Sequence, residues 1–385
     1  MKKALAFVLA LLSLPLLFSC GKEQQPEASQ EVLPSPTVAA SEEPSSDPTV
    51  YYSPTTGTAY DAPPEYKPMS VMIENQSQAR PQTGLQQADI IYEAMAEGDI
   101  TRFMCIFNDQ KPSVAGPIRS ARLYYINVQK EWDSPLVHYG GPDDPNSPSY
   151  IYGSSTKYIK LRVDGIKGTY NDYFWRDKSR SAPHNVYTDL GKIDEELYDY
   201  TPNNRIQFSF SDTPSYTGKT VDTVSLPYVT SVENFVTFQY DSAKDKFFRY
   251  EKGKAFEVRT VSEDEDGKQT TTTAPLSVQN LIVQYAETYV RNNDGGRRMV
   301  EMVGEGKCEF FIGGKHISGS WERKSLDDST QYFDESGLPI ILKPVSYTHL
   351  ARPGPPSFHH RFLHVGAGFL GFPQLQRRLT AHSAF

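Results

Sequence analysis

The sequence is poor in cysteine, slightly acidic, and without an apolar run long enough for a membrane helix. It has three cysteines in 385 residues, and its 47 acidic residues outnumber 39 basic ones. The resulting net charge of −8 makes nucleic acid, or adhesion to anionic lipid by charge alone, a poor match. The apolar stretch from Ala4 to Phe18 is shorter than the roughly 20 residues that span a bilayer. We therefore expect no nucleic-acid partner.

The first twenty residues have the pattern of an export signal. Lys2 and Lys3 precede the apolar stretch, which ends in Ser19 and Cys20. A small residue followed by Cys resembles the lipobox of bacterial lipoproteins. The resemblance implies that residues 1–19 are a signal peptide and that Cys20 carries a diacylglycerol, whose two acyl chains anchor stably. The alternative is an ordinary secretory signal that contains a cysteine.

Residues 20–50 read as a spacer behind this lipid anchor. The segment from Gly21 to Pro48 consists mostly of Glu, Gln, Pro, Ser, Thr and Ala and has no apolar periodicity. Such a composition cannot bury enough surface to offset the entropy of ordering. We expect a semi-stiff tether that holds a folded body at the outer face of the cytoplasmic membrane.

The other end of the chain differs in composition from the rest. No acidic residue lies between Val345 and Phe385, a stretch with four arginines and five of the eight histidines. Its first residues, Val345 to Leu350, resemble one reading frame of an adapter used to prepare sequencing libraries. This predicts that residues 345–385 are foreign to the protein. The histidines there lack acidic or cysteine co-ligands, so no metal site is expected. Subtracting the four arginines leaves a net charge of −12.

Two cysteines remain in the body of the chain. Cys105 and Cys308 both lie in apolar surroundings with the pattern of strands, in different halves of the sequence. Buried free thiols are expected, with an interdomain disulfide as the alternative. Neither has the electropositive setting that activates a nucleophile.

Loop signals near residues 201–220 divide the body into two domains. The first, residues 51–205, alternates strands and helices and is predicted to be a mixed α/β domain. Its expected elements are strands at 70–73, 89–96, 100–107 and 135–139 and a helix from Pro117 to about Trp132, opened by a proline at its first position.

The second domain, residues 218–344, has an apolar period of two and is predicted to be β-rich and antiparallel. Residues 235–240 and 247–250 flank a turn and predict a hairpin. Gly313 and Gly314 allow the positive φ of a second tight turn. Further strands are expected at 281–285 and 338–342. The predicted fold class is therefore α/β or α+β in the first domain, followed by an antiparallel β domain.

Arg119 and Arg122 are the first candidates for a binding site. They are three residues apart and would share one face of the first turns of the predicted helix. Positive side chains oppose the dipole there, which favours a nearby anion, and free N–H groups with two guanidiniums could bind carboxylate or phosphate. The alternative is that Glu93 or Glu97 neutralises them as an internal ion pair.

Two histidines are candidates for acid–base chemistry. His138 ends a strand just before Gly140 and Gly141, and His184 follows Arg180 in a proline-containing loop. Together with Glu93 and Glu97, they would suffice for acid–base catalysis with charge stabilisation by arginine. A lone histidine is otherwise a hydrogen-bonded structural residue. No spacing matches a metal site or a nucleophile elbow, and no cofactor is predicted.

Several motifs together resemble the YerB-like lipoprotein family of Gram-positive bacteria, which has no established biochemical function. The resemblance covers about residues 56–344 and implies a location and a fold more than an activity. It also places Arg102 and Asn185 among the candidate ligand-binding residues. After Lys343-Pro344, where family members continue into a final strand, this chain departs from the pattern. The motifs are Ser70–Asn75, Ala79–Leu85, Tyr92-Glu93, Glu97-Gly98, Thr101-Arg102, Gly116–Arg122, His138 with Gly140-Gly141, Ala182–Asn185, Asn280–Tyr285, Gly313–Lys315 and Gly319–Trp321.

Two functions follow as hypotheses. The first is a lipid-anchored binding or accessory protein that recognises an anionic component of the cell envelope through Arg119 and Arg122. The second is a hydrolase or transferase for cell-wall or phosphoester material, with His138 as the base and the arginines stabilising developing charge. A purely structural spacer is a third interpretation.

Overall fold

The computed structural model describes residues 50–98, 100–203, 208–228, 235–344 and 347–353. The predicted signal peptide, Cys20, the spacer and most of the predicted foreign tail lie outside these ranges. The described residues belong to one compact unit that begins at Pro48. Within the described ranges, no helix is long and apolar enough to cross a membrane.

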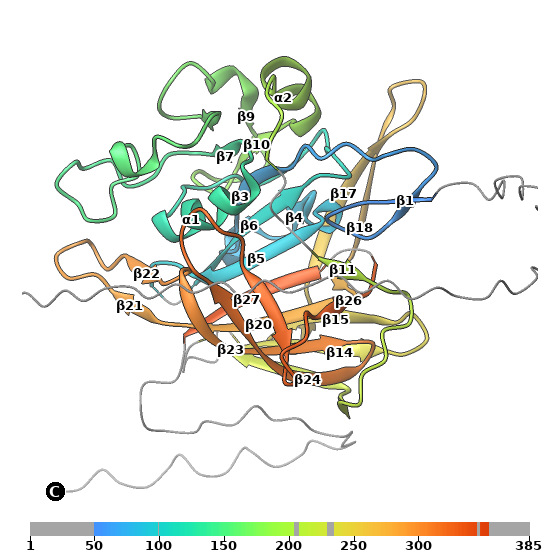
Figure 1. The fold of residues 1–385 in the computed structure, drawn as a ribbon. Helices are drawn as coiled ribbons and strands as arrows, with labels where there is room; N and C mark the ends of the chain where they lie inside the picture. The colour runs from blue at the N-terminus through green and yellow to red at the C-terminus, as the bar shows by residue number, and fades with distance from the viewer. Residues whose placement is uncertain (1–49, 99, 204–207, 229–234, 345–346, 354–385) are drawn as a thin grey trace, which may run out of the picture. The chain divides into compact units, whose positions relative to one another are not determined.

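The first half of the described chain is a mixed sheet with two α-helices (Figure 1). The expected strands at 70–73, 89–96, 100–107 and 135–139 are confirmed as β3, β5, β6 and β7. The elements are β1 (Tyr51–Tyr52), β2 (Ala59–Tyr60), β3 (Met69–Glu74), β4 (Gln82–Thr83), β5 (Ile90–Met95), β6 (Thr101–Phe107), α1 (Leu123–Trp132), β7 (Leu136–His138), β8 (Arg162–Asp164), β9 (Phe174–Arg176), β10 (Val186–Thr188) and α2 (Leu190–Leu197).

The second half is largely antiparallel, as predicted. The two expected hairpins are confirmed as β14–β15 and β23–β24, whereas only the end of the expected strand 338–342 is extended. The elements are β11 (Ser209–Phe210), β12 (Lys219–Thr220), β13 (Thr223–Pro227), β14 (Phe235–Asp241), β15 (Lys246–Glu251), β16 (Lys254–Ala255), β17 (Glu257–Glu263), β18 (Gln269–Pro275), β19 (Ser277–Val278), β20 (Asn280–Ala286), β21 (Thr288–Val290), β22 (Arg298–Val300), β23 (Gly304–Ile312), β24 (Lys315–Arg323), β25 (Gln331–Asp334), β26 (Ile341–Leu342) and β27 (Tyr347–Pro353).

One sheet runs through both halves. Its strand order is β12-β24-β23-β20-β27-β5-β6-β3-β7-β8, with β25 on β24. β20 comes from the second half and β5 from the first, and β27 lies between them, parallel to both. In Figure 1, β27 lies between the cyan strands of the first half and the orange strands of the second. β27 therefore joins the two halves through main-chain hydrogen bonds. It lies within residues 345–385, so in this chain the segment predicted to be foreign fills the gap between β20 and β5.

Three apolar clusters form the core. The strands β3, β5 and β6 are buried along their whole length, because both faces of this part of the sheet are covered. On one face, α1 packs with Trp132 and Tyr125 in a cluster that also includes Phe310 and Trp321 of the second half. On the other, α2 joins a cluster with Phe256. The third cluster packs β13, β14 and β15 on β20 and β23.

The prediction for the start of α1 is wrong. The helix begins at Leu123 rather than at Pro117, and its N-cap residue Arg122 has extended backbone angles. The residues before the helix form hydrogen bonds with β3 and with the chain after β7 instead. Arg119 N donates to Met72 O of β3, and Ala121 N donates to Gly140 O. These bonds hold residues 117–122 extended, so Arg119 and Arg122 do not share a helix face.

The cysteine prediction is confirmed. Cys105 on β6 and Cys308 on β23 are both free and buried. Burial raises the pKa of both thiols well above the ordinary value. Neither thiol is therefore available as a thiolate nucleophile at neutral pH.

A buried ion pair ties β5 of the first half to β15 of the second. Both guanidinium nitrogens Nη1 and Nη2 of Arg249 donate to the carboxylate of Glu93. The two side chains are 1% and 0% exposed. Burial opposes the charge of Arg249, but the charge and hydrogen bonds of Glu93, together with the charge of Glu251, outweigh it and raise the pKa of Arg249. Thr101 Oγ1 also donates to Glu93 over 2.6 Å.

A second buried pair joins α1 to β24. Arg323 Nη1 donates to Glu131 Oε1 over 2.8 Å, and both side chains are almost fully buried. Glu131 also accepts the backbone N–H of Thr330. In both pairs, each buried charge is thus matched by a partner from the other half. Separating the two halves would break both ion pairs, and any of these charges that stayed buried would lack its partner.

Another buried carboxylate forms hydrogen bonds with residues near the start of the described chain. Asp89, just before β5, accepts a hydrogen bond from Thr55 Oγ1 over 2.6 Å. The neighbouring Asp109 accepts one from Thr56 Oγ1, also over 2.6 Å. Burial, together with the charge of Asp109, raises the pKa of Asp89 to about 7.

We expect Glu93→Gln to destabilise the protein by about 3–5 kcal/mol, because it leaves Arg249 charged, buried and unpaired. Replacing both residues together, by Glu93→Leu and Arg249→Met, should cost much less. Urea unfolding measures both effects. The exposed pair Lys244–Asp241 supplies the control, since Lys244→Gln should change stability by less than about 1 kcal/mol. A double variant that is no more stable than Glu93→Gln would contradict this reasoning.

Asp89 makes stability depend on pH in a defined direction. Its folded pKa of about 7 lies above the unfolded value near 3.9, so the folded state holds the proton more tightly. The stabilisation contributed by protonated Asp89 is therefore complete below about pH 4 and is lost as the pH rises toward about 7. The loss is on the order of 4 kcal/mol. Urea unfolding across this pH range gives the free energies of unfolding of the wild type and of Asp89→Asn. The difference between these two free energies should narrow or reverse as the pH rises. A pH-independent difference would refute the assignment.

Candidate functional site

A basic cavity lies between two loops of the first half and strand β17 of the second. Its volume is about 460 Å³, and it is lined by Gln78, Arg80, Pro81, Ser179, Arg180, Ser181, His184 and Arg259. The lining contains three arginines and no acidic residue. Seven of the lining residues come from two segments that meet here: the chain before β4, in which Gln78 lies on a single 3-10 turn, and the chain between β9 and β10.

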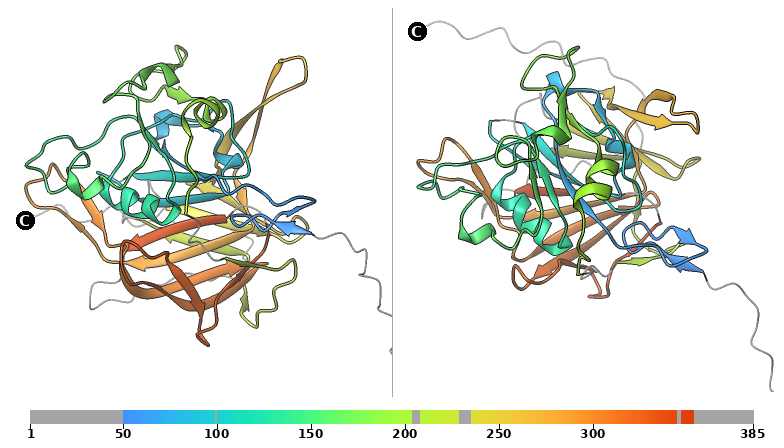
Figure 2. Two further views of the ribbon diagram at one scale, coloured as in Figure 1. Left: turned by 45° about the horizontal axis from the view of Figure 1, so that its top comes forward. Right: turned by 90° about the horizontal axis from the view of Figure 1, so that it is seen from above.

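Arg259 comes to this cavity through pairing between the two halves. β17 runs parallel to the short strand β4, with Arg259 opposite Thr83. Gly84 N donates to Arg259 O over 2.9 Å and extends this pairing. The β17–β18 hairpin projects from the body in two views (Figures 1 and 2), and Arg259 lies near its base. No carboxylate among the described residues lies within ion-pair distance of Arg259.

Arg80 is held in place by three hydrogen bonds. Its Nη1 donates to Glu251 Oε1 over 2.7 Å, and its Nε and Nη2 donate to the side chain and the carbonyl of Asn75. Burial lowers the pKa of Arg80, and the charge of Glu251 opposes this. The guanidinium also lies over the ring of Phe256. Arg80 is thus rigid, and one carboxylate balances its charge.

Arg180 is positioned by the loop that carries Arg80 and by Asn185. Arg180 Nη2 donates to Pro81 O over 2.7 Å, which ties the two loops of the cavity together. Asn185 Nδ2 donates to the carbonyls of Asp177 and Arg180, and its Oδ1 accepts from Arg176. Asn185, a predicted ligand-binding residue, is buried below the cavity and therefore supports the loop that carries Arg180.

His184 is the one predicted candidate that lines the cavity. Its Nδ1 lies 3.0 Å from Oε1 of Glu74, the last residue of β3. Glu74 is buried, and the same oxygen lies 3.0 Å from Nε of Arg119. One carboxylate therefore faces both Arg119 and His184, and the predicted site residue Arg119 is neutralised by Glu74, which the sequence did not indicate.

Arg122 and Arg102 form a separate cluster around Glu97. Glu97 accepts two hydrogen bonds from Arg122 in a bidentate ion pair. Burial raises the pKa of Glu97, but the hydrogen bond and charge of Arg122, with the charge of Arg102, outweigh it and bring the pKa to about 2. Burial lowers the pKa of Arg102 to about 10, and its Nη1 donates to Ser120 O. The internal ion pair, weighed above as an alternative, is the arrangement found here.

His138 lies apart from both groups and has no exposed surface. Its Nδ1 is 2.8 Å from Gly140 O, and its Nε2 is 4.0 Å from Asp164. Burial lowers the pKa of His138, and the carboxylate of Asp164 acts in the opposite direction. Asp164 in turn accepts from Tyr152 and from two backbone N–H groups. This environment is that of a structural histidine rather than of a base that a substrate could reach.

Family models match almost all of the folded body. Residues 55–204 match the N-terminal domain, and residues 224–345 the C-terminal domain, of a family described as "Protein of unknown function (DUF3048)". The chain belongs to the DUF3048 family. It is also 32% identical over 270 residues to the Bacillus subtilis protein described as "Putative lipoprotein YerB", covering 67% of this chain and 74% of that protein.

A solved structure shares the fold of this DUF3048 protein. The crystal structure of YerB from Bacillus subtilis matches with a TM-score of 0.62 and 27% sequence identity. The match covers 78% of this chain and 96% of that one. These similarities confirm the predicted family and the two-part fold. The family description assigns no activity, so the chemistry of the site has to be argued from its own residues.

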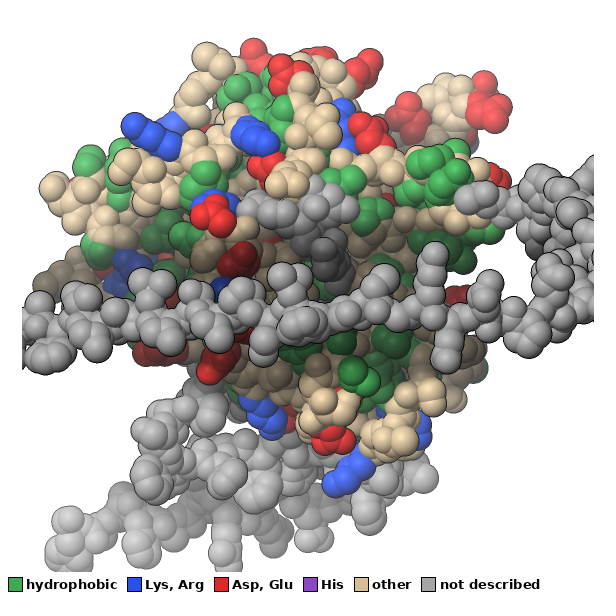
Figure 3. Space-filling model, viewed as in Figure 1, with side chains coloured by type: hydrophobic (Ala, Val, Ile, Leu, Met, Phe, Trp, Pro, Cys, Tyr) green, Lys and Arg blue, Asp and Glu red, His purple; other side chains and the backbone are tan. Residues whose placement is uncertain are grey.

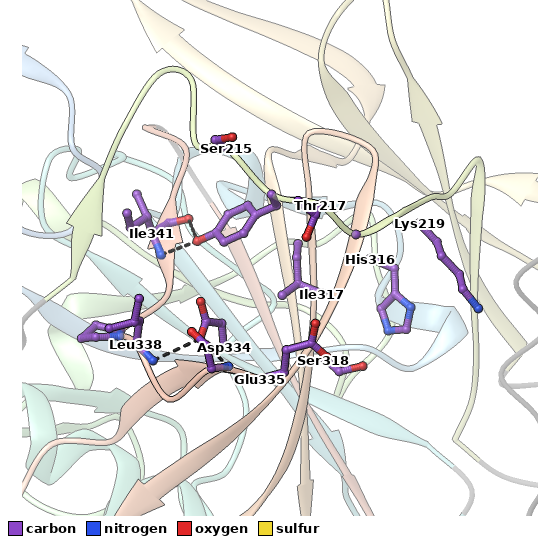
Figure 4. A pocket seen from close by; sticks show the side chains of 14 residues that line it. Ser215, Thr217, Lys219, His316, Ile317, Ser318, Asp334, Glu335, Leu338 and Ile341 are labelled. Carbon is purple, nitrogen blue, oxygen red and sulfur yellow. Dashed lines mark hydrogen bonds between the residues drawn. The ribbon is translucent and has the colours of Figure 1, made fainter.

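The charge of the basic cavity contrasts with the face of the DUF3048 protein shown in Figure 3 and with its larger cavity. On the face shown in Figure 3, basic and acidic side chains are interspersed, without an extended area of one sign. A larger cavity of about 560 Å³, between β12, β24 and β25, has a mixed lining. Figure 4 shows Lys219 and His316 on one side of it and Leu338 and Ile341 on the other. Asp334 and Glu335 also line it and outnumber Lys219, so this cavity has no excess of positive charge.

In the described part of the chain, no group of three or more His, Cys, Asp or Glu side chains could hold a metal ion. Sequence reasoning missed Arg80, Arg259 and Glu74 as site residues. Arg80 and Glu74 lie within motifs that the family resemblance had singled out, so that signal was present. Arg259 had none, because only the pairing of β17 with β4 brings it to the cavity.

Proposed function

We propose that this DUF3048 protein is a membrane-anchored extracytoplasmic lipoprotein that binds an anionic component of the cell envelope in the basic cavity. The lipobox-like sequence at Cys20 supports the anchor. So does the similarity to a Bacillus subtilis protein described as a lipoprotein. The predicted position at the outer face of the cytoplasmic membrane follows from that anchor.

The observation that carries the binding proposal is the unbalanced charge of the cavity. Three guanidiniums line it, and no acidic side chain does. Glu251 balances Arg80, and Asp177 lies 3.7 Å from Arg180, but Arg259 has no carboxylate partner among the described residues. In a protein of net charge −8, such a local excess favours an anionic ligand.

The position of the cavity also favours a ligand site. It lies where β17 of the second half meets β4 of the first, and binding sites gather at such boundaries. Arg80 and Arg180 are fixed by hydrogen bonds before any ligand arrives, so little entropy is lost on binding. The predicted site at Arg119 and Arg122 lacks this property, because Glu74 and Glu97 already occupy both guanidiniums.

Arg259→Gln tests this function in the full-length protein. We expect it to weaken binding of a polyanion, polyphosphate or polyglutamate, by about tenfold, since a charge-assisted hydrogen bond contributes about 1.5–3 kcal/mol. Titration calorimetry at low ionic strength measures the affinity. Lys268→Gln is the matched control, because it removes the same charge from the exposed tip of the same hairpin.

Two results would contradict the proposal. One is that neither polyanion binds the wild-type protein. The other is that Arg259→Gln and Lys268→Gln weaken binding equally, which would indicate a general effect of net charge. The variant Arg122→Gln, which removes a charge at the predicted site that Glu97 already neutralises, should bind like the wild type, and circular dichroism would check that it is folded.

A further inference from the structure

His184 is fixed at the edge of the basic cavity by a buried carboxylate. Its Nδ1 lies 3.0 Å from Oε1 of Glu74, which is only 1% exposed. His184 itself is 13% exposed and lines the cavity. Because Glu74 holds the Nδ1 edge of the ring, Nε2 is the ring nitrogen left to the cavity. His184 N also donates to Ser181 O, so the backbone is fixed as well.

This contact determines which ring nitrogen carries a proton. Glu74 also faces the cation Arg119 at 3.0 Å, so the carboxylate is an acceptor and Nδ1–H donates to it. In the neutral ring, Nε2 then presents a lone pair to the cavity. A lone pair repels an anion, whereas an Nε2–H attracts one. An anion that reaches His184 is therefore held best when the ring takes up a second proton.

The rest of the lining indicates which anion fits. Apart from Pro81, every lining side chain is polar or charged, and none is Phe, Tyr or Trp. The cavity thus offers no surface for an apolar or sugar-stacking body. Its donors come from three segments: the loop at Arg80, the loop from Ser179 to His184, and β17 at Arg259. Donors converging from several directions suit the three or four oxygens of a tetrahedral oxyanion better than the two oxygens of a planar carboxylate.

We infer that the basic cavity takes a phosphate or sulfate ester and that His184 acquires a proton as this ligand binds. The inference rests on the proposed function, since it names the ligand class and the protonation of the same site. Glu74 acts as a positioning residue that sets the orientation and tautomer of the ring. Arg80, Arg180 and Arg259 supply the fixed positive charge.

The charged groups that face His184 from the surrounding elements are Glu74 on β3, Arg119 before α1, Arg80 and Arg180 on the loops, and Arg259 on β17. Glu251 and Asp177 stand behind Arg80 and Arg180. Histidine is the side chain whose charge ordinarily changes between about pH 6 and 8. Asp89 also titrates in this range, so the His184→Gln variant is needed to separate the contribution of His184 from that of other groups.

Sulfate tests the proton uptake, because its own charge does not change over this range. We expect the full-length protein to bind sulfate about tenfold more tightly at about pH 6 than at about pH 8. Titration calorimetry in buffers of different ionisation enthalpy should show a proton taken up on binding. His184→Gln should abolish both effects, and Glu74→Gln should weaken them. His316→Gln, which changes a histidine at the other cavity, should leave them intact.

Further arms test the ligand class and its source. Inorganic phosphate and poly(glycerol phosphate) should bind at least about tenfold more tightly than acetate and polyglutamate of matched charge. Vesicles of phosphatidylglycerol, compared with phosphatidylcholine, test a lipid headgroup as the source. Binding to poly(glycerol phosphate) or to phosphatidylglycerol vesicles supports a phosphate ester as the ligand. The one that binds more tightly identifies whether the phosphate comes from a polymer or from a lipid headgroup.

The failures are distinguishable. If polyglutamate binds as well as poly(glycerol phosphate), the ligand class is wrong, although the anion site stands. If sulfate binds with the same affinity at both pH values, or His184→Gln keeps the pH dependence, the role of His184 is wrong. If no anion binds, the proposed function fails as well.

Discussion

The buried pair of Glu93 and Arg249 is the constraint on which the rest of the structure depends. Glu93 lies on β5 in the first half, and Arg249 lies on β15 in the second. Neither charge can be buried without the other, because the desolvation of each is offset only by its partner. Charges of alternating sign lead from this pair to the basic cavity. Arg249 lies 3.7 Å from Glu251, and Glu251 in turn binds Arg80, which lines the cavity. The position of Arg80 is thus set jointly by Glu251 of the second half and Asn75 of the first.

This chain of charges explains why the cavity cannot be assigned to one domain. Arg80, Arg180 and His184 come from the first family domain, and Arg259 comes from the second. Arg259 reaches the cavity only because β17 pairs with β4. Each half alone would present an incomplete set of donors. Ligand affinity and the docking of the two halves are therefore coupled, since both depend on the same few contacts.

Local sequence patterns predicted the strands and hairpins well, because an apolar period of two and a Gly-Gly turn are local signals. They failed at α1. Pro117 has the pattern of a helix start, but hydrogen bonds to Met72 and Gly140 hold the segment extended. The pair of Arg122 with Glu97 was among the alternatives weighed, but the surroundings of Arg119 and Arg259 were not predicted, because they are formed by residues far away in sequence. Arg119 is neutralised by Glu74, 45 positions upstream, and Arg259 is 179 positions from Arg80. Such pairings are set by strand order, which no short window contains.

β27 has a consequence for the order in which the protein can fold. It is the last described strand, yet it lies in the middle of the sheet, between β20 and β5. During synthesis, all other strands emerge before it. Until it is made, β20 and β5 each have an unpaired edge, and both strands are apolar along most of their length. Unpaired apolar edges are templates for association with other chains. β20 and β5 therefore each keep such an edge until residues 347–353 have been made, a period in which a chaperone that covers these edges would improve the yield of this chain.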